Sequence, residues 1–445
     1  MLKTNALNPF ILVVSAFLLT MFFGAILLMQ PWASQVQNQT SFIDALFTSA
    51  SALFVTGLAV LETGSHYSFA GQLVILALIQ IGALGVVTIG GYLVYLFGQR
   101  FYYKDRQLLG DSLGISDKGE VISILRRVVR YVFILELIGA VLLCVNFLLH
   151  SYNFADALWF GVFHSISAFA NAGFDVFGQG NSAASLLEVG IALEIVMLLI
   201  IIGGLGFPVW MDLRQKSANP SHRLSLHSKV VLLINAILLI VGALVFYLFE
   251  SQVRLAEFGF LQHFRESLFH SVSSRTAGFS AFDLSEMSKP SLVFMMILMF
   301  IGGAPASTAG GIKVTAALII FLLTWSLVNG SLSLNFMRRR IPTDLILRSV
   351  SVAVISLLLV VVVTIALEFF DDPPFLHAIF ESFSAMGTVG LSLGLTPTLS
   401  VLGKIMLIIS MFMGRVGLYA LLYGVIFYSK RHRIIRNYPK ANLCL

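Results

Sequence analysis

Long apolar segments alternate with shorter apolar and polar stretches along the chain. Seven long segments lie close to the ~20 residues that a helix needs to cross the hydrocarbon core of a bilayer. They cover residues 9–29, 73–97, 128–149, 189–210, 230–249, 349–367 and 405–427. An eighth apolar run, 292–328, is too long for one plain helix and is interrupted at 302–313. The pattern therefore predicts eight membrane-spanning segments.

Four shorter apolar stretches lie between the predicted spans, at 42–53, 154–169, 258–272 and 374–386. They are too short to cross the bilayer. Each alone would fit a helix that lies flat in the membrane interface. Because the four occupy equivalent places in the chain, we favour re-entrant half-helices that enter and leave on the same side.

The composition requires lipid around most of the chain. Of the 445 residues, 58% are hydrophobic and 11% are charged, against roughly 25% charged residues in soluble domains. Two cysteines exclude a disulfide framework and a cysteine zinc site. The sequence has no Walker A or HExxH motif, and the glycine-rich segment 203–206 lies in an apolar run that we expect to be helical. We predict an integral membrane protein that is not an enzyme and that depends on ion gradients.

Lys and Arg are unequally divided between the two sides of the predicted membrane. The side with both termini and the segments 99–130, 214–229 and 337–348 carries 21 of them, and the opposite side carries five. The positive-inside rule then predicts a multi-pass protein of the cytoplasmic membrane, with both termini in the cytoplasm and the short helices entering from outside. The 14 acidic residues outside would concentrate cations at the entrance, or merely accompany this orientation.

Each short apolar stretch is followed by small polar residues, a glycine, and then Leu or Phe. The glycines are Gly57, Gly173, Gly278 and Gly390. Span, short helix, glycine loop and span thus form a unit that occurs four times in parallel. We expect an all-α membrane protein with four parallel span–pore-helix–span repeats in pseudo-fourfold symmetry around a central pore. The expected repeats are 1–98, 128–213, 229–328 and 346–428, followed by a cytoplasmic tail at 429–445.

A glycine after a short helix indicates how such a pore would bind ions. Glycine adopts φ > 0 without a Cβ penalty, so successive carbonyls can face one axis. Rings of carbonyls can replace the water shell of a monovalent cation, and inward-pointing helix C-termini add partial negative charge. The alternative is that the glycines serve close helix packing. The predicted ion-binding residues are Val55, Thr56, Gly57, Asn171, Ala172, Gly173, Thr276, Ala277, Gly278, Thr388, Val389 and Gly390.

The interruption at 302–313 has paired glycines at both ends and a central proline, which exclude a continuous helix. It is either a kinked helix with close packing or, as we favour, a mobile loop that opens and closes the cavity. Arg415, within the last predicted span, needs partners in the protein interior. Loop carbonyls would make it a latch; it could also repel ions. The predicted gate residues are Gly302, Gly303, Pro305, Ser307, Thr308, Gly310, Gly311, Lys313 and Arg415.

Three further charged residues lie in or beside apolar segments. Glu136 and Glu194 lie nearer the ends of their spans than the middle, so we expect them to pair or to reach the interface. Arg275 lies beside a filter glycine, which is unusual for a cation path. We expect it to turn outward, toward an acid such as Glu266 or Asp283.

These features resemble the Ktr/Trk/HKT superfamily of potassium transporters over nearly the whole chain. The resemblance implies that the four glycines select ions, that K⁺ at the filter is the transported substrate, and that the broken span of the third repeat is the gate. No additional pair of helices precedes the first span, as in the Ktr-type membrane subunit. The resemblance also implies a homodimer in the lipid membrane on a cytoplasmic ring of nucleotide-binding regulatory subunits, with sodium as a potential stimulator. It implies no cofactor and no nucleic acid.

The filter departs from the Thr-Val-Gly-Tyr-Gly signature of tetrameric potassium channels. Thr56 and Thr388 keep the first threonine, whereas Asn171 and the pair Arg275-Thr276 break the symmetry. Fewer carbonyl rings imply fewer dehydrated sites. The resemblance implies a weaker preference for potassium over sodium, which fits this departure.

A sodium- or proton-coupled secondary carrier of a small cation is the main alternative. Such carriers usually have inverted repeats and ionisable residues in the path, whereas the repeats here are parallel. A membrane-anchored enzyme or receptor is a second alternative, but the sequence offers no soluble domain or catalytic cluster to anchor. Ion flux without a co-substrate would separate these functions.

Overall fold

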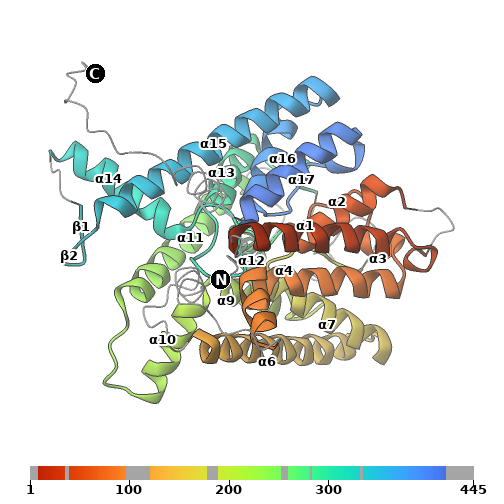
Figure 1. Cartoon of the computed structure of the whole chain (residues 1–445), viewed down its shortest axis with the longest axis horizontal. Helices are drawn as coiled ribbons and strands as arrows, with labels where there is room; N and C mark the ends of the chain where they lie inside the picture. Colours follow the sequence, from red (N-terminus) through yellow and green to blue (C-terminus); the bar gives the residue numbers. More distant parts are fainter. Residues whose placement is uncertain are drawn as a thin grey trace, which may run out of the picture.

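The computed structural model of the chain describes residues 9–35, 40–96, 121–177, 189–251, 259–280, 283–330 and 334–416. These residues form helices and one two-stranded hairpin (Figure 1). The first half contains α1 (Pro9–Leu28), η1 (Pro31–Ala33), α2 (Phe42–Leu53), α3 (Thr63–His66), α4 (Phe69–Leu96), α6 (Val121–Leu149), α7 (Phe154–Ala170), α9 (Ala192–Gly204) and α10 (Phe207–Ala218). The second half contains α11 (Leu226–Glu250), α12 (Phe260–Ser273), η3 (Leu284–Glu286), α13 (Lys289–Phe300), α14 (Val314–Val328), β1 (Asn335–Phe336), β2 (Arg339–Arg340), α15 (Thr343–Asp371), α16 (Phe375–Gly387), η4 (Thr396–Thr398) and α17 (Val401–Val416).

Three of the described helices, α6, α11 and α15, are long and apolar enough to cross a membrane by themselves. The pair α9 and α10 counts as a fourth span if the two bent helices are taken together. The predicted tail at 429–445, the end of the last predicted span and most of the loop at 99–130 lie outside the described residues.

The prediction that 189–210 forms one continuous span is wrong. Helix α9 ends at Gly204, α10 begins at Phe207, and their axes differ by 99°. The segment 203–206 therefore contains the end of α9 and the bend, and does not lie within one continuous helix. The cause is Gly206, whose φ of 85° belongs to the left-handed region and cannot continue a right-handed helix. Gly85 has a similar φ of 70° and kinks α4 in the same way.

The four short apolar stretches fold as the helices α2, α7, α12 and α16. Side-chain caps fix where two of them begin, because Ser41 accepts a hydrogen bond from the backbone of Asp44 and Asn153 accepts one from that of Asp156. Most residues in the C-terminal halves of the four helices are buried. The short helices therefore end inside the protein, where their last carbonyls depend on protein partners.

A serine in each of the first three short helices fastens it to the preceding long helix. The hydroxyl donates to a backbone carbonyl, from Ser49 to Met21 at 2.7 Å, from Ser165 to Glu136 at 2.6 Å and from Ser271 to Leu239 at 2.9 Å. A glycine of the long helix faces each serine, namely Gly24, Gly139 and Gly242. The missing Cβ lets the two helices approach closely, as is common in membrane proteins.

The contacts between helices follow a closed order. Each short helix packs against the long helix before it, in the pairs α1–α2, α6–α7, α11–α12 and α15–α16. Each also packs against the helix that follows the previous short helix, in the pairs α4–α7, α9–α12 and α13–α16, and α17 returns to α2. The last element of the bundle thus contacts the first short helix.

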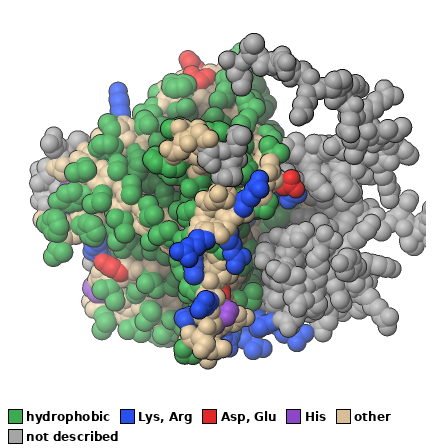
Figure 2. Space-filling model, turned by 90° about the vertical axis from the view of Figure 1, so that its left-hand side faces the viewer, with side chains coloured by type: hydrophobic (Ala, Val, Ile, Leu, Met, Phe, Trp, Pro, Cys, Tyr) green, Lys and Arg blue, Asp and Glu red, His purple; other side chains and the backbone are tan. Residues whose placement is uncertain are grey.

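Apolar side chains cover the outside of the bundle, while many polar ones lie within. Along α6, Phe133, Leu137 and Val141 are all more than half exposed, and apolar side chains occupy much of the face in Figure 2. By contrast, serines and threonines of the short helices are buried. This inverted distribution is expected where the surrounding medium is lipid.

Candidate functional site

The four glycine loops share one backbone conformation. Each glycine has a positive φ, as does the residue two positions before it. The φ values are 57° and 93° at Val55 and Gly57, 60° and 70° at Asn171 and Gly173, 73° and 75° at Thr276 and Gly278, and 49° and 98° at Thr388 and Gly390. Each loop therefore has two residues with positive φ, separated by one residue that does not have a positive φ. Since three of the four earlier positions are Asn or Thr and one is Val, only the final glycine is common to all four loops.

The four glycines also meet one another. A Cβ on Gly57 would lie 2.5 Å from the carbonyl oxygen of Ala172, and one on Gly173 would lie 2.8 Å from that of Ala277. The next two would lie 2.2 Å from a carbonyl oxygen each, from Gly278 to Val389 and from Gly390 to Thr56. The contacts run from loop to loop and return to the first. Glycine is thus required here twice, for its positive φ and for space.

Serines of the short helices hold the loops in this shape. In the first and fourth loops the hydroxyls of Ser51 and Ser384 accept a hydrogen bond from the glycine N–H, at 3.1 Å in both cases. In the second loop Ser167 instead donates to the carbonyl of Phe174 at 2.7 Å, and in the third Ser273 donates to that of Phe279. The loops therefore fall into two pairs: in the first and fourth the serine hydroxyl accepts from the glycine N–H, and in the second and third it donates to a backbone carbonyl.

The predicted gate segment is a non-helical connection between α13 and α14. Its two ends are tied together, since the N–H of Gly302 donates to the carbonyl of Ile312 at 2.8 Å and that of Val314 to Gly303 at 3.1 Å. Lys313 Nζ donates to the carbonyl of Ala309 at 2.7 Å. The segment is therefore a folded loop with internal bonds rather than a kink in one helix.

This loop lies directly against the glycine loops. The hydroxyl of Thr308 donates to the carbonyl of Phe169 at 3.2 Å and lies 3.3 Å from the amide oxygen of Asn171. A Cβ on Gly310 would meet the hydroxyl of Thr388. Side chains at the start of the second and fourth glycine loops thus contact the loop.

Arg415 joins the loop to another part of the bundle. One guanidinium nitrogen, Nη1, donates to the carbonyl of Thr308, and Nη2 donates to that of Gly82 in α4 at 2.6 Å. The expected contact between Arg415 and a loop carbonyl is therefore present. Its second partner, Gly82, was not predicted.

The other charged residues have identifiable partners. Glu194 forms an ion pair with Arg265 at 2.5 Å, and Glu136 accepts a hydrogen bond from the neutral amide of Gln80 at 3.0 Å. Of the two expected arrangements, pairing or reaching the interface, the structure has partners for both residues. The prediction for Arg275 is wrong, because its guanidinium donates to the amide oxygen of Asn235 in α11 rather than to an acid. A neutral partner suits a residue that is only 8% exposed and turned into the bundle.

The sequence analysis missed a second set of glycines. A Cβ on Gly82, Gly203 or Gly414 would lie 1.9, 1.9 or 2.2 Å from the last-turn carbonyl oxygen of α2, α7 or α16, respectively. These glycines let the following helix touch the end of each short helix. A signal was present in the sequence, since each is followed three residues later by another glycine, at 85, 206 and 417.

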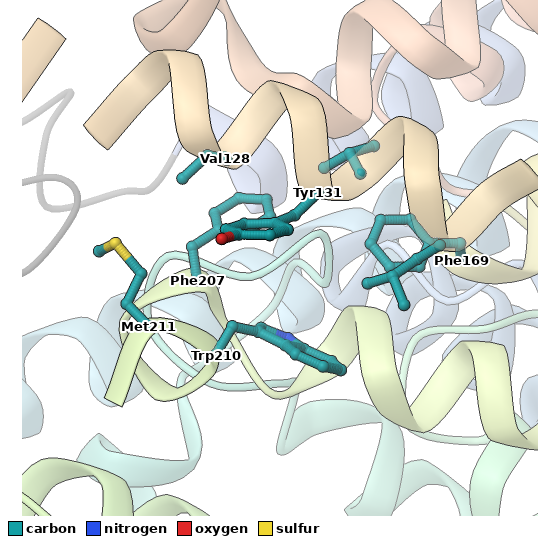
Figure 3. Close-up of a pocket in the computed structure, with 8 residues that line it drawn as sticks. Val128, Tyr131, Phe169, Phe207, Trp210 and Met211 are labelled. Atoms are coloured by element: carbon teal, nitrogen blue, oxygen red, sulfur yellow. The ribbon is translucent and has the colours of Figure 1, made fainter. Parts of the chain in front are cut away.

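An apolar pocket lies between α6 and α10, close to the end of α7. Tyr131, Phe207 and Trp210 are among its lining residues (Figure 3). Its volume of about 10 Å³ is at the lower limit for a single water molecule. We regard it as a packing gap rather than a ligand site.

A helical bundle with an apolar exterior and buried polar loops at its centre defines an all-α membrane transporter. The comparisons assign it more closely: the family model described as "TrkH: Cation transport protein" matches residues 2–429, so the chain belongs to that family of cation transporters. This confirms the predicted superfamily and the prediction that the protein is not an enzyme.

Relatives from bacteria agree with this assignment. The chain is 35% identical over 447 residues to the potassium/sodium uptake protein NtpJ of Enterococcus hirae, covering 99% of this chain and 97% of the relative. It is 37% identical over 403 residues to the Ktr system potassium uptake protein B of Bacillus subtilis, covering 90% and 89%. Its fold matches the crystal structure of the potassium transporter TrkH from Vibrio parahaemolyticus with a TM-score of 0.74 and 19% identity, over 95% of this chain and 86% of that one.

Proposed function

We propose that the protein takes up potassium across the cytoplasmic membrane as the ion-translocating subunit of a Ktr-type system. The observation that carries the proposal is the closed cycle of contacts among Gly57, Gly173, Gly278 and Gly390. Four glycine loops from one chain that meet at one place can form a pore with pseudo-fourfold symmetry. The names of the relatives, which are potassium or potassium/sodium uptake proteins, support this assignment.

The alternation of positive and negative φ along the loop backbone determines which chemical groups line the proposed pore. Alternation turns successive carbonyls toward the same side, and carbonyl oxygens can replace the hydration shell of K⁺. The hydroxyls of Thr56 and Thr388 are buried and have no hydrogen-bond partner among the described residues, so they are further oxygen ligands within reach. The C-terminal ends of the four short helices add negative potential.

The loop between α13 and α14 is the proposed gate. Arg415 is its latch, because it holds Thr308 of the loop and Gly82 of α4 at the same time. Opening then requires that the guanidinium release at least the loop carbonyl. The ion gradient supplies the energy for uptake, since one charge that crosses 100 mV gains about 2.3 kcal/mol.

The proposed assembly is a homodimer of this chain on a ring of regulatory subunits. Both termini and the basic segments 214–229 and 337–348 would lie in the cytoplasm, where a ring of nucleotide-binding regulatory subunits would dock on a homodimer of this chain. Sodium would act as a stimulating ion rather than as an obligatory partner.

The pore is tested by Gly390→Ala in purified protein reconstituted into liposomes. Its Cβ would collide with the carbonyl of Thr56, so ⁸⁶Rb⁺ uptake should fall to the level of empty liposomes. Gly394→Ala is the matched control, because Gly394 has a similar φ of 84° in the same segment but nothing within 4 Å of its Cβ position. It should keep wild-type uptake within about twofold. Equal uptake by Gly390→Ala and wild type, or uptake that needs an added proton or sodium gradient, would contradict the pore.

A further inference from the structure

A cavity lies between the start of α11 and the β1–β2 hairpin; the hairpin is at the left of Figure 1. The volume of the cavity is about 380 Å³, within the ~300–1,000 Å³ of small-molecule sites. One wall consists of residues 223–226 together with Lys229, and the other of Met337 and Arg339. Two segments more than one hundred residues apart in sequence therefore build one concave site.

The cavity is strongly basic. Three of its lining side chains, Arg223, Lys229 and Arg339, are cations. All three are exposed, and none forms an ion pair with an acid in the part of the chain that the structure describes. Figure 2 shows this face, on which Lys and Arg side chains gather among apolar ones. The cavity thus carries positive charge that no acid among the described residues compensates by an ion pair.

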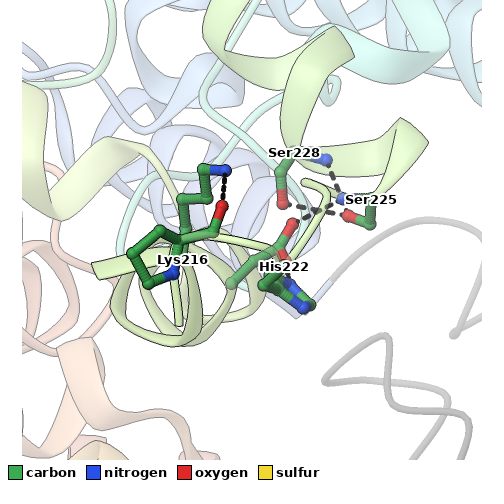
Figure 4. A network of polar contacts seen from close by, with 6 residues as sticks. Lys216, His222, Ser225 and Ser228 are labelled. Atoms are coloured by element: carbon green, nitrogen blue, oxygen red, sulfur yellow. Dashed lines mark hydrogen bonds and ion pairs between the residues drawn. The ribbon is translucent and has the colours of Figure 1, made fainter. Parts of the chain in front are cut away.

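The acid that precedes the first wall of the cavity along the chain already has partners. Asp212 of α10 pairs with His222 Nε2 at 2.6 Å and accepts the N–H of Ser225 at 2.8 Å. The hydroxyls of Ser225 and Ser228 are 3.0 Å apart and belong to the same network (Figure 4). These bonds fix the loop that carries Arg223 and direct the carboxylate of Asp212 to the loop backbone.

The opposite wall is a strained turn. Met337 and Arg338 join β1 to β2 with φ values of 47° and 62°, in a two-residue turn whose positions ordinarily favour Asn and Gly. A left-handed conformation is unfavourable for a residue with a Cβ, and such strain is concentrated at functional sites. The pairing of Phe336 with Arg339 then holds the arginine beside the cavity.

The cavity lies where spans leave the membrane on the side with most Lys and Arg. Helix α11 begins there at Leu226, α15 begins at Thr343 just after the hairpin, and α14 ends at Val328 shortly before it. Trp325, near the end of α14, is 62% exposed, and tryptophan favours the boundary between lipid and water. A lipid headgroup would therefore be at the height of the cavity.

We propose that this cavity binds the phosphate group of an anionic phospholipid. Arginine side chains such as Arg223 and Arg339 can bind phosphate oxygens in a bidentate manner. The positive end of the α11 dipole adds to the attraction. Basic pockets between spans on the cytoplasmic side are suited to acidic lipid headgroups. The site is separate from the glycine loops and does not depend on the proposed transport activity.

The test compares Arg223→Gln/Arg339→Gln with Arg338→Gln, a neighbouring turn residue that does not line the cavity. Full-length protein in detergent is titrated with phosphatidylglycerol, phosphatidylcholine or inorganic phosphate, and binding is followed by native mass spectrometry and thermal shift. Each lost charge-assisted hydrogen bond weakens binding by roughly tenfold. The double variant should therefore bind phosphatidylglycerol at least about tenfold more weakly, while Arg338→Gln and wild type bind alike.

Several outcomes decide the proposal. Inorganic phosphate that stabilises wild type as well as phosphatidylglycerol does, but not the double variant, supports phosphate recognition with free phosphate as the source. Equal binding of phosphatidylglycerol by the double variant and wild type would overturn the site. Equal losses in the double variant and Arg338→Gln would overturn it too, because general surface charge would then suffice. If the double variant does not fold, Arg339→Lys keeps the charge without the bidentate geometry and should still weaken binding.

Discussion

The helices after the second and third glycine loops break at the same place but with different results. Helix α9 ends with Gly203 and Gly204, and the chain passes through Leu205, bends at Gly206 and continues directly as α10. After α13 it also meets two glycines, Gly302 and Gly303, but the next helix begins only at Val314. The difference shows that a break in this helix is a property of more than one repeat, whereas the additional loop belongs to the third.

The two broken helices are also connected to each other. The N–H of Ala304 donates to the carbonyl of Gly204 at 3.0 Å, and the N–H of Phe207 donates to that of Ala306 at 3.0 Å. The bend in the second repeat thus supplies backbone partners that a straight helix would have used internally. Non-helical backbone at membrane depth needs such partners. The bend at Gly206 therefore supports the loop between α13 and α14. Substitutions in the loop and substitutions in the bend can show separately what each contributes to ion flux.

The largest effect is expected from Arg415→Ala, which removes the latch on the loop of the third repeat. Hydrogen bonds from a charged group contribute about 1.5–3 kcal/mol each. Losing both should therefore raise ⁸⁶Rb⁺ flux in liposomes at least about tenfold. Arg415→Lys, which keeps the charge but lacks the fork that reaches two carbonyls, should lie between wild type and Arg415→Ala. Unchanged or slower flux in folded Arg415→Ala protein would show that the residue is structural.

A smaller effect is expected from Gly206→Ala, which acts on the supporting side. Its Cβ would lie 2.5 Å from the carbonyl oxygen of Pro305, at a φ of 85°. The loop must then move away from α10, and a strain of about 1 kcal/mol corresponds to roughly fivefold higher flux. Gly204→Ala is the matched control, because the nearest atom to its Cβ position is 3.8 Å away. If both variants behave alike in the flux assay, the bend has no special link to the loop.

The comparison also shows what the sequence can predict. Apolar run length identified the short helices, because their boundaries depend on local composition and capping residues such as Ser41 and Asn153. Apolar run length predicted one continuous span at 189–210 and missed the bend there, since hydrophobicity carries no information on φ. Only the spacing of Gly203 and Gly206 contained a hint of the bend.

Some features of the candidate site could be predicted from the sequence, and others could not. The four glycines could be found because each follows a short helix in the same register. The partner of Arg275 could not, because Asn235 is forty residues away in α11 and acids closer in sequence competed as candidates. The role of Gly82 was hidden for a similar reason. Its requirement for glycine comes from the carbonyl of Leu53, and its own carbonyl accepts a hydrogen bond from Arg415. Only the folded chain brings both partners to it.

The smallest effect is expected at the point where the loop of the third repeat meets the filter of the second. At the position two before the glycine, the third and fourth repeats have Thr276 and Thr388, whereas the second has Asn171. The longer amide reaches both Thr308 of the loop and Thr276, at 3.3 and 3.4 Å. Asn171→Thr makes the second loop like the third and fourth at this position and removes the link to the loop between α13 and α14.

Such hydrogen bonds contribute about 0.5–1.5 kcal/mol, and a contact of 3.3 Å is long for this kind of bond, so flux should rise about two- to threefold. Thr308→Val removes the same link from the other side, together with the hydrogen bond to the carbonyl of Phe169. If the link is what matters, the double variant Asn171→Thr/Thr308→Val should show no more flux than Thr308→Val alone in a double-mutant cycle. Additive increases would instead mean that Asn171 acts on the ion path independently of the loop. The ratio of ⁸⁶Rb⁺ to ²²Na⁺ flux distinguishes the two roles, because a loop contact changes both rates together and a filter contact changes their ratio.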